Sequence, residues 1–309
     1  MSIAEPLLAT VQEHFNANEV DMALSALESG LSKLRHQLPS SEWDAVCHSC
    51  VSHPVSRYIY QDPLTKWAYD KPRGYAGDAV LMDFIYHWPS IHAEVTGASE
   101  LGKAIYQYSR NASAVSAVRF RLDVLVRLID EFAAKIPAGP QILSIASGHV
   151  REAHLAKAVK AGRVRRFVAL DQDPETMALV AKELGGYGVE AITESARAIV
   201  RGKCDLGRFD LIYSVGLSDY LPVRVFQRLF SRMFSMLNPG GSLLIPNFVP
   251  DNLDAGYMEA FMDWHLVCRD EDEMRALTKA LPQSEMAKEG VQTFTDPGRN
   301  IAFLQITKA

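Results

Sequence analysis

Two short segments of the sequence combine residue types that could hold a ligand carrying a ribose. In the first, Leu143–Val150, a run of mostly apolar residues leads into Ser147, Gly148 and His149. Glycine lets the backbone approach a ligand closely, and a helix that follows such a loop offers unpaired N–H groups. The second is Asp171, which ends another apolar run 23 positions after Gly148. A carboxylate at that place can accept both hydroxyls of a ribose.

A polar loop follows a third apolar run and offers groups for acid–base chemistry. Ser214 ends that run, and Asp219 lies in the loop. Asp219 is the best general-base candidate in the chain if a proton must leave a nucleophile. The alternative is that it caps the helix expected over Pro222–Phe234. The role of His149 is also open, since its imidazole could act as a base, contact a carboxylate or cap the next helix.

Two further candidate residues, Tyr75 and Arg119, come before Leu143–Val150 in the sequence. Tyr75 lies between Gly74 and Gly77 in a turn-rich segment, and such a loop could close with the aromatic ring facing a cation. A packing role at a helix–helix connection is the equal alternative. Arg119, with Arg121 two positions on, could grip a carboxylate with its guanidinium fork, or could mark a solvated helix face.

The four cysteines give no metal site. Cys47 and Cys50 form a C-x-x-C pair with His48 between them and His53 just beyond. Half of a zinc site and a redox pair are the chemical interpretations. No second C-x-x-C or H-x-x-x-H completes a ligand set, so we interpret the pair as small apolar side chains one helical turn apart, and we expect no metal.

The elements that must position these residues change character along the chain. Apolar spacing of three and four residues predicts helices from residue 1 to about 136, where Pro and Gly residues stop the pattern. Short apolar runs then alternate with helical stretches, which predicts a mostly parallel, Rossmann-like sheet. Strands are expected at Gln141–Ala146, Phe167–Leu170, Val189–Ile192, Phe209–Ser214, Ser242–Pro246, Gln292–Phe294 and Asn300–Thr307, with helices at His149–Lys160 and Pro174–Leu184 among those between them.

The last two strands predict an antiparallel C-terminal hairpin across Pro297-Gly298. The expected fold class is therefore α/β, with the sheet domain preceded by an all-helical N-terminal lid domain. We place the lid or substrate domain at residues 1–118 and the sheet domain at residues 119–309.

The composition and net charge indicate which kinds of molecule the chain binds. The chain has 309 residues, 48% of them hydrophobic, and a formal net charge of −5. A nucleic-acid groove needs clustered Lys and Arg, so a small-molecule substrate is expected and a polynucleotide is not. The N-terminal residues lack the pattern of a signal peptide, and no stretch of about 18 apolar residues occurs, so we expect a cytoplasmic protein without membrane insertion. The sequence leaves a homodimer open as the assembly.

The chain resembles class I S-adenosylmethionine-dependent methyltransferases over about residues 119 to 309. Leu143–Val150 matches the first motif of that family, Asp171 the ribose acid, Phe209–Ser214 the fourth motif and Asn238–Gly241 the late turn. In this chain Ser144 stands where the family carries an acid, and Ala146 and Val150 stand where it carries glycines. The resemblance implies S-adenosylmethionine as cosubstrate. The expected cofactor-binding residues are Ser147, Gly148, His149, Asp171, Gln172, Arg119, Ser195 and Ser214, and the catalytic candidates are Asp219, Tyr75 and Ser214.

The segments Lys71–Asp78, Ala114–Arg121 and Met262–Arg269 resemble a helical-lid subgroup of that family. It includes enzymes associated with 3-hydroxy fatty acid methyl esters and is similar to azetidine-2-carboxylate synthases, which implies secondary metabolism. The leading hypothesis is a methyltransferase for a small or lipid-like acceptor. The alternative is a cyclase that converts S-adenosylmethionine into azetidine-2-carboxylate and methylthioadenosine, and a third hypothesis is a binding module without catalysis.

Overall fold

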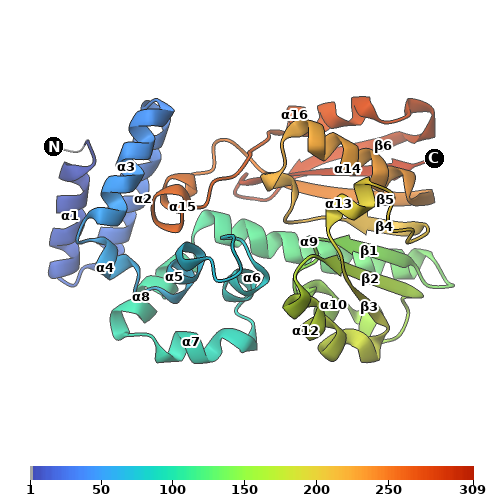
Figure 1. The fold of residues 1–309 in the computed structure, drawn as a ribbon, viewed down its shortest axis with the longest axis horizontal. Helices are drawn as coiled ribbons and strands as arrows, with labels where there is room; N and C mark the ends of the chain where they lie inside the picture. Colours follow the sequence, from blue (N-terminus) through green and yellow to red (C-terminus); the bar gives the residue numbers. More distant parts are fainter. Residues whose placement is uncertain (1–2) are drawn as a thin grey trace. The chain divides into compact units, whose positions relative to one another are not determined.

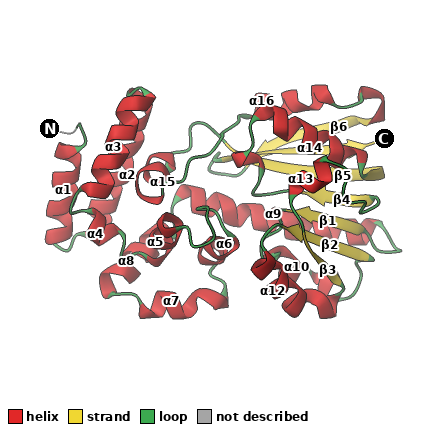
Figure 2. Cartoon of the chain, in the orientation of Figure 1, coloured by secondary structure: helices red, strands yellow, loops and turns green. Residues whose placement is uncertain are grey.

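The computed structural model describes residues 3–309, which form two units. The helical unit consists of two parts of the chain, the residues up to Arg119 and the later segment Asp251–His265. The sheet unit consists of Phe120–Pro250 and Leu266–Ala309. In the described residues all the strands belong to the sheet unit (Figure 2). The sequence-based division at 118/119 remains a prediction about independent domains. The later segment Asp251–His265 was assigned to the other domain by that division.

The helical unit is built from short amphipathic helices. In α1 the side chains of Leu8, Val11 and Phe15 are buried at the spacing of one helix face. Asp62 caps α5 by accepting from the N–H groups of residues 64 and 65, and Asp78 caps α6 in the same manner. The helices are α1 (Glu5–Asn16), α2 (Val20–Gln37), α3 (Ser40–Ser52), α4 (Ser56–Ile59), α5 (Pro63–Asp70), α6 (Ala79–Tyr86), η1 (Pro89–Ile91), α7 (His92–Gly97) and α8 (Glu100–Ser109), together with α15 (Ala255–Met262).

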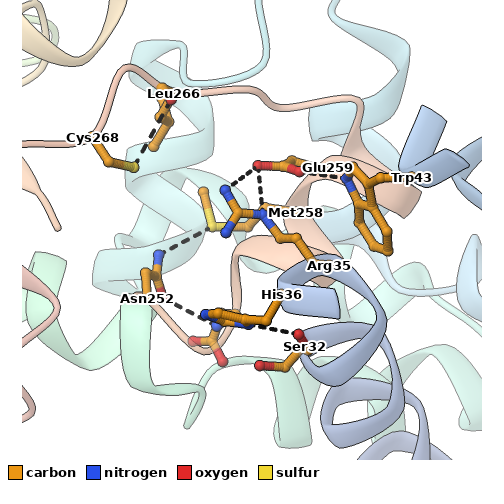
Figure 3. A network of polar contacts seen from close by, with 10 residues as sticks. Ser32, Arg35, His36, Trp43, Asn252, Met258, Glu259, Leu266 and Cys268 are labelled. Atoms are coloured by element: carbon orange, nitrogen blue, oxygen red, sulfur yellow. Dashed lines mark hydrogen bonds and ion pairs between the residues drawn. The ribbon is translucent and has the colours of Figure 1, made fainter. Parts of the chain in front are cut away.

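The segment Asp251–His265 is anchored by a half-buried acid on α15. Glu259 accepts hydrogen bonds from Arg35 Nε at 2.9 Å and from Trp43 Nε1 at 2.6 Å. Figure 3 shows the carboxylate of Glu259 lying between these two side chains, which come from α2 and α3. Charge-assisted bonds of this kind are stronger than neutral ones. They tie a late segment of the chain to two of the first three helices.

The sheet unit contains a seven-stranded sheet in the order β3-β2-β1-β4-β5-β7-β6 (Figure 1). The first five strands are parallel, and β7 pairs antiparallel with both β5 and β6. The strands are β1 (Gln141–Ile145), β2 (Arg166–Asp171), β3 (Val189–Thr193), β4 (Phe209–Tyr213), β5 (Leu237–Phe248), β6 (Met286–Thr295) and β7 (Ile301–Lys308). The predicted fold class, including the C-terminal hairpin, is confirmed.

Helices accompany the strands, and alternate side chains of the strands face different layers. Leu143, Ile145 and Ile212 join a core with the apolar faces of α13, α14 and α16, while Ser144 and Tyr213 point to the opposite face. The helices are α9 (Ser113–Lys135), of which residues 113–119 belong to the helical unit, α10 (Arg151–Leu155), α11 (Lys157–Lys160), α12 (Pro174–Leu184), η2 (Gly185–Tyr187), α13 (Ala196–Val200), η3 (Ser218–Tyr220), α14 (Val223–Ser235), α16 (Glu271–Ala276), η4 (Leu277–Ala280) and η5 (Gln283–Glu285).

Two sequence predictions about these elements need correction. The helix expected over His149–Lys160 begins at Arg151 and is broken at Ala156, which has extended dihedral angles. The turn at Asn238–Gly241 lies inside β5 rather than before it. Phe209 of β4 pairs with Leu237 of β5, but Leu211, two residues further along β4, pairs with Ser242. The four residues of β5 between these two partners therefore form a bulge.

Candidate functional site

The reversal of strand order lies between β1 and β4. From β1 the sheet continues through β2 to β3 on one side and through β4 to β5 on the other. In open α/β sheets, ligands bind beyond the carboxyl ends of the strands at such a switch point. The loops that follow β1, β2 and β4 therefore define the candidate site, and they contain most of the predicted residues.

The loop after β1 has left-handed backbone at three alternate residues, only one of which is glycine. Ala146, Gly148 and Val150 have φ angles of 51°, 55° and 51°. Glycine adopts this left-handed region readily, whereas a β-branched residue such as valine rarely does. Ala146 and Val150 thus hold a backbone conformation that glycine adopts more readily than they do. Backbone strain of this kind clusters at functional sites.

Asp171 connects the ends of β1 and β2. Its Oδ2 accepts from the N–H of Gly148 at 3.0 Å, and its Oδ1 accepts from the N–H of Asp173 at 3.0 Å. Asp173 itself caps α12 by accepting from the N–H of Glu175. Asp173 is therefore the helix cap, whereas Asp171 bonds to the loop after β1.

Ser214 follows directly after β4, next to the reversal point. The side chain is 2% exposed, and its Oγ has no hydrogen-bond partner among the described residues. A buried hydroxyl without a partner is uncommon, because the lost hydration is normally replaced by a hydrogen bond. The position and the unsatisfied hydroxyl both suit a residue that contacts a ligand.

Asp219 is buried after β4, but it does not cap the following helix. Its Oδ1 accepts from the N–H of Phe248 at 2.8 Å, and α14 has no side-chain cap at Pro222. Burial raises the pKa of Asp219 to about 6, against the lowering effects of the Phe248 hydrogen bond and of the charges on Arg121 and Arg269. A carboxylate with this pKa is ionised at neutral pH and is a stronger base than an exposed aspartate.

Arg121 lies among buried acids of the sheet unit. It is 5% exposed, and its charge lowers the pKa of both Asp219 and Glu152. Glu152, at the start of α10, accepts from the hydroxyl of Tyr213 at 2.7 Å. Burial nevertheless keeps the pKa of Glu152 above its ordinary value. Glu152 was not predicted as a site residue, and Arg121 was weighed only together with Arg119.

The predicted Arg119 lies in the helical unit and makes local contacts. Its Nη1 donates to the carbonyl oxygen of Arg110 at 2.5 Å, and its Nη2 donates to Ser116 at 3.1 Å. Tyr75 is also in the helical unit, half-buried in the loop between α5 and α6. Roles for Arg119 and Tyr75 at the cofactor remain predictions, because they lie in a different unit from the loops at the sheet edge.

The remaining predicted residues lie in the loops that follow β1, β2 and β3 of the sheet unit. Ser147 is half-buried, and Gln172 is exposed beside Asp171. His149 is buried with its Nδ1 3.3 Å from Nη2 of Arg151, so it belongs to a network that continues to Glu183. Ser195 precedes α13 without capping it, and its N–H donates to Glu194 at 2.7 Å. Their cofactor contacts also remain predictions.

The C-x-x-C pair shows no metal-binding arrangement in the described residues. Cys47 and Cys50 are both free, and burial is the main cause that raises the pKa of each thiol to about 12. Thiols with a pKa this high are poor nucleophiles and poor metal ligands. Over residues 3–309, no group of three His, Cys, Asp or Glu side chains is placed to hold a metal ion.

Comparison with known proteins identifies similarity at the level of structure only. No protein-family model matches the sequence, and no curated protein matches it. A solved structure of a possible exported protein from Bordetella parapertussis is similar with a TM-score of 0.59 and 16% identity, covering 99% of this chain and 96% of that one. At this identity the likeness shows a shared fold.

Two solved methyltransferases are similar to a smaller extent. Magnesium protoporphyrin IX methyltransferase (ChlM) from Synechocystis PCC 6803, with bound SAH, has a TM-score of 0.49 and 9% identity, covering 74% of this chain and 96% of that one. N-methyltransferase NodS from Bradyrhizobium japonicum WM9 has a TM-score of 0.43 and 14% identity, covering 62% and 95%. No helix in the described part of the chain is long and apolar enough to span a membrane. The cytoplasmic location stays a prediction.

Proposed function

We propose that the chain binds S-adenosylmethionine at the carboxyl edge of β1, β2 and β4 and catalyses methyl transfer to a small or lipid-like acceptor. The observation that carries the proposal is the loop after β1. It keeps left-handed backbone at Ala146, Gly148 and Val150, and it is bonded to the acid that ends β2. The strand order and the C-terminal hairpin also agree with the architecture that the resemblance to class I methyltransferases implies.

The residues present suit the proposed cosubstrate. Asp171 keeps lone pairs on both oxygens beyond its two backbone bonds, so it can accept ribose hydroxyls. Ser214 Oγ is a buried polar atom that a ligand would satisfy. Asp219 is the candidate to accept a proton from the acceptor's nucleophile, since its raised pKa makes it basic at neutral pH.

When bound, S-adenosylmethionine supplies a methyl carbon already activated by the sulfonium. The protein's part would be to orient the two reactants, exclude water and accept a proton. Little covalent assistance is needed from side chains. This agrees with a site of hydrogen-bonding groups and buried acids.

The test is to incubate the purified chain with S-adenosylmethionine, first alone and then with a panel of hydroxy acids, fatty acids and amines, and to follow products by mass spectrometry. S-adenosylhomocysteine together with a methylated acceptor is the expected result. Methylthioadenosine with azetidine-2-carboxylate, formed without any acceptor, would replace methyl transfer by the cyclase alternative. Saturable binding without turnover on the whole panel would support the non-catalytic alternative, and absence of binding would overturn the proposal.

A further inference from the structure

The helical unit contains a cavity of about 1000 Å³ that is separate from the switch-point loops of the sheet unit. Its walls come from α2, from α8 with the connection to α9, and from the residues just before α15. Ligand pockets for small molecules have volumes of roughly 300–1,000 Å³. The cavity is therefore large enough for an organic molecule.

The titratable groups in the lining are mainly acidic. Asp21, Glu28 and Asp254 contribute carboxylates, Tyr108 a phenol and Lys33 a single cation among the described lining residues. Lys33 is exposed. None of the three carboxylates forms an ion pair with any residue in the described chain. The cavity thus has an excess of negative charge, with three carboxylates and one lysine that pairs with none of them.

Glu28 and Asp254 are the acids on which the argument depends, because both are half-buried and neutral donors hold them in place. Glu28 Oε2 accepts from the hydroxyl of Tyr108 at 2.8 Å, and Asp254 Oδ2 accepts from the N–H of Ala114 at 2.5 Å. Burial is the main cause that raises the pKa of Glu28 to about 7. The Tyr108 bond opposes this rise, and the charge of Asp254 adds to it. Two partly buried carboxylates that repel each other would be stabilised by a cation.

We propose that this cavity binds a small organic cation of the amine or guanidine class, with Glu28 and Asp254 as its carboxylate partners. A bare metal ion fits less well, because the described residues contain no group of three metal-ligating side chains. Ser25, Ser29 and Gln107 add hydroxyl and amide groups to the lining. Their oxygen atoms can accept hydrogen bonds from the remaining N–H groups of such a ligand. The proposal does not depend on the proposed methyl transfer.

The test is calorimetric titration of the full chain at about pH 8, where the raised pKa of Glu28 still leaves it mostly ionised. The probes are 1,4-diaminobutane and agmatine, and 1,4-butanediol is the uncharged control of similar length. We expect saturable binding of one or both cations and none of the diol. In Glu28→Gln the dissociation constant should rise by about tenfold or more, because a charge-assisted contact is removed. Glu42→Gln removes an exposed acid of the same unit outside the cavity and should leave binding unchanged.

A second variant and a second readout support the result. Asp254→Asn keeps an acceptor for the N–H of Ala114 and should also weaken binding, so a failure of one variant to fold leaves the other as a test. Near pH 7, binding to the wild type should release protons from Glu28, seen as a dependence of the heat on the buffer, whereas Glu28→Gln should show no such release. Absence of saturable binding, equal affinity for the diol, or unchanged affinity in both variants would each overturn the proposal.

Discussion

The carboxylate of Asp171 accepts a hydrogen bond from the backbone N–H of Gly148 at 3.0 Å, although the two residues are 23 positions apart. This bond joins the loop after β1 to the end of β2. It also fixes the orientation of the residue expected to hold the ribose. In the proposed site, one side chain would therefore couple ribose binding to the order of the loop.

Asp171→Ala should lower both ligand affinity and stability. We expect the dissociation constant for S-adenosylmethionine to rise at least about tenfold, because the ribose hydroxyls would no longer donate to a charged carboxylate. The free energy of unfolding should fall by roughly 1–3 kcal/mol, since the N–H groups of Gly148 and Asp173 lose their acceptor. Calorimetric titration and chemical denaturation measure the two effects.

Asp173→Ala is the matched control for that variant. Asp173 caps α12 through the N–H of Glu175, so its removal should cost about 1 kcal/mol of stability. It should leave the affinity for S-adenosylmethionine within about twofold. If Asp173→Ala weakened binding as much as Asp171→Ala, the effect would belong to the general order of the loop rather than to ribose recognition.

Ala146→Gly should stabilise the chain by up to about 1 kcal/mol. The φ angle of 51° at Ala146 costs an L-residue roughly 1–2 kcal/mol, and part of the gain is lost to the greater freedom of glycine in the unfolded chain. The measurement is the urea midpoint. Ala181→Gly, at an exposed position inside α12, should instead destabilise by about 1 kcal/mol. A loss of stability in Ala146→Gly would mean that the left-handed residue is not strained.

The pH dependence of turnover should report the ionisation of Asp219. A base with a pKa of about 6 is active when deprotonated, so kcat/KM should rise with pH through about 6 and level off above it. Asp219→Asn keeps an acceptor for the N–H of Phe248. It should lower kcat by about a hundredfold or more and abolish the inflection. Retention of both the rate and the inflection would reduce Asp219 to an anchor for the end of β5.

Stability should follow the opposite course from turnover over the same pH range. The pKa of Asp219 is higher in the folded chain than its ordinary value of 3.8, so the folded state binds the proton more tightly than the unfolded state does. The contribution of this group to stability is therefore fully present below about pH 4 and is lost as the pH rises to about 6. Asp219→Asn should lack this part of the pH dependence in denaturant titrations.

Arg121→Met should be far more damaging than Arg119→Met. Arg121 is buried and its charge favours the ionised forms of Asp219 and Glu152, so its removal leaves Asp219 with Arg269 and Glu152 with Arg151 as compensating charges, at a cost of about 3 kcal/mol. Arg119 loses only local hydrogen bonds, and a cost of about 1 kcal/mol is expected. Thermal denaturation of both variants is the measurement, and equal losses of stability would contradict the role given to Arg121.

Arg119 and Arg121 show which features of the site could be predicted from the sequence and which could not. They are two positions apart on one helix, so they point to nearly opposite sides. Arg121 lies three residues after Val118 and four before Leu125, which are both buried, so it shares their face of α9, and the alternative of a solvated helix face is wrong for Arg121. The electrostatic interaction of Arg121 with Glu152 and Asp219 could not be predicted from helix spacing, because these acids lie 31 and 98 positions further along the chain.

Local sequence signals were sufficient for the parts of the site formed by neighbouring residues. The cap at Asp173, the helix that starts at Pro174 and the strand that ends at Asp171 all follow from short-range preferences, and all three are present. The pairing of Glu152 with Tyr213 spans 61 positions, and no local pattern encodes it. Left-handed backbone at Val150 was equally hidden, because valine disfavours that conformation.

The return of Asp251–His265 to the helical unit has a consequence for biosynthesis. Glu259 supplies the acceptor for both Arg35 and Trp43, so the first three helices leave the ribosome long before their partner has been translated. The first five strands are synthesised in that interval. A nascent chain that stops before residue 251 would therefore expose an incomplete helical surface. Such a surface is the kind that chaperones bind and proteases cut.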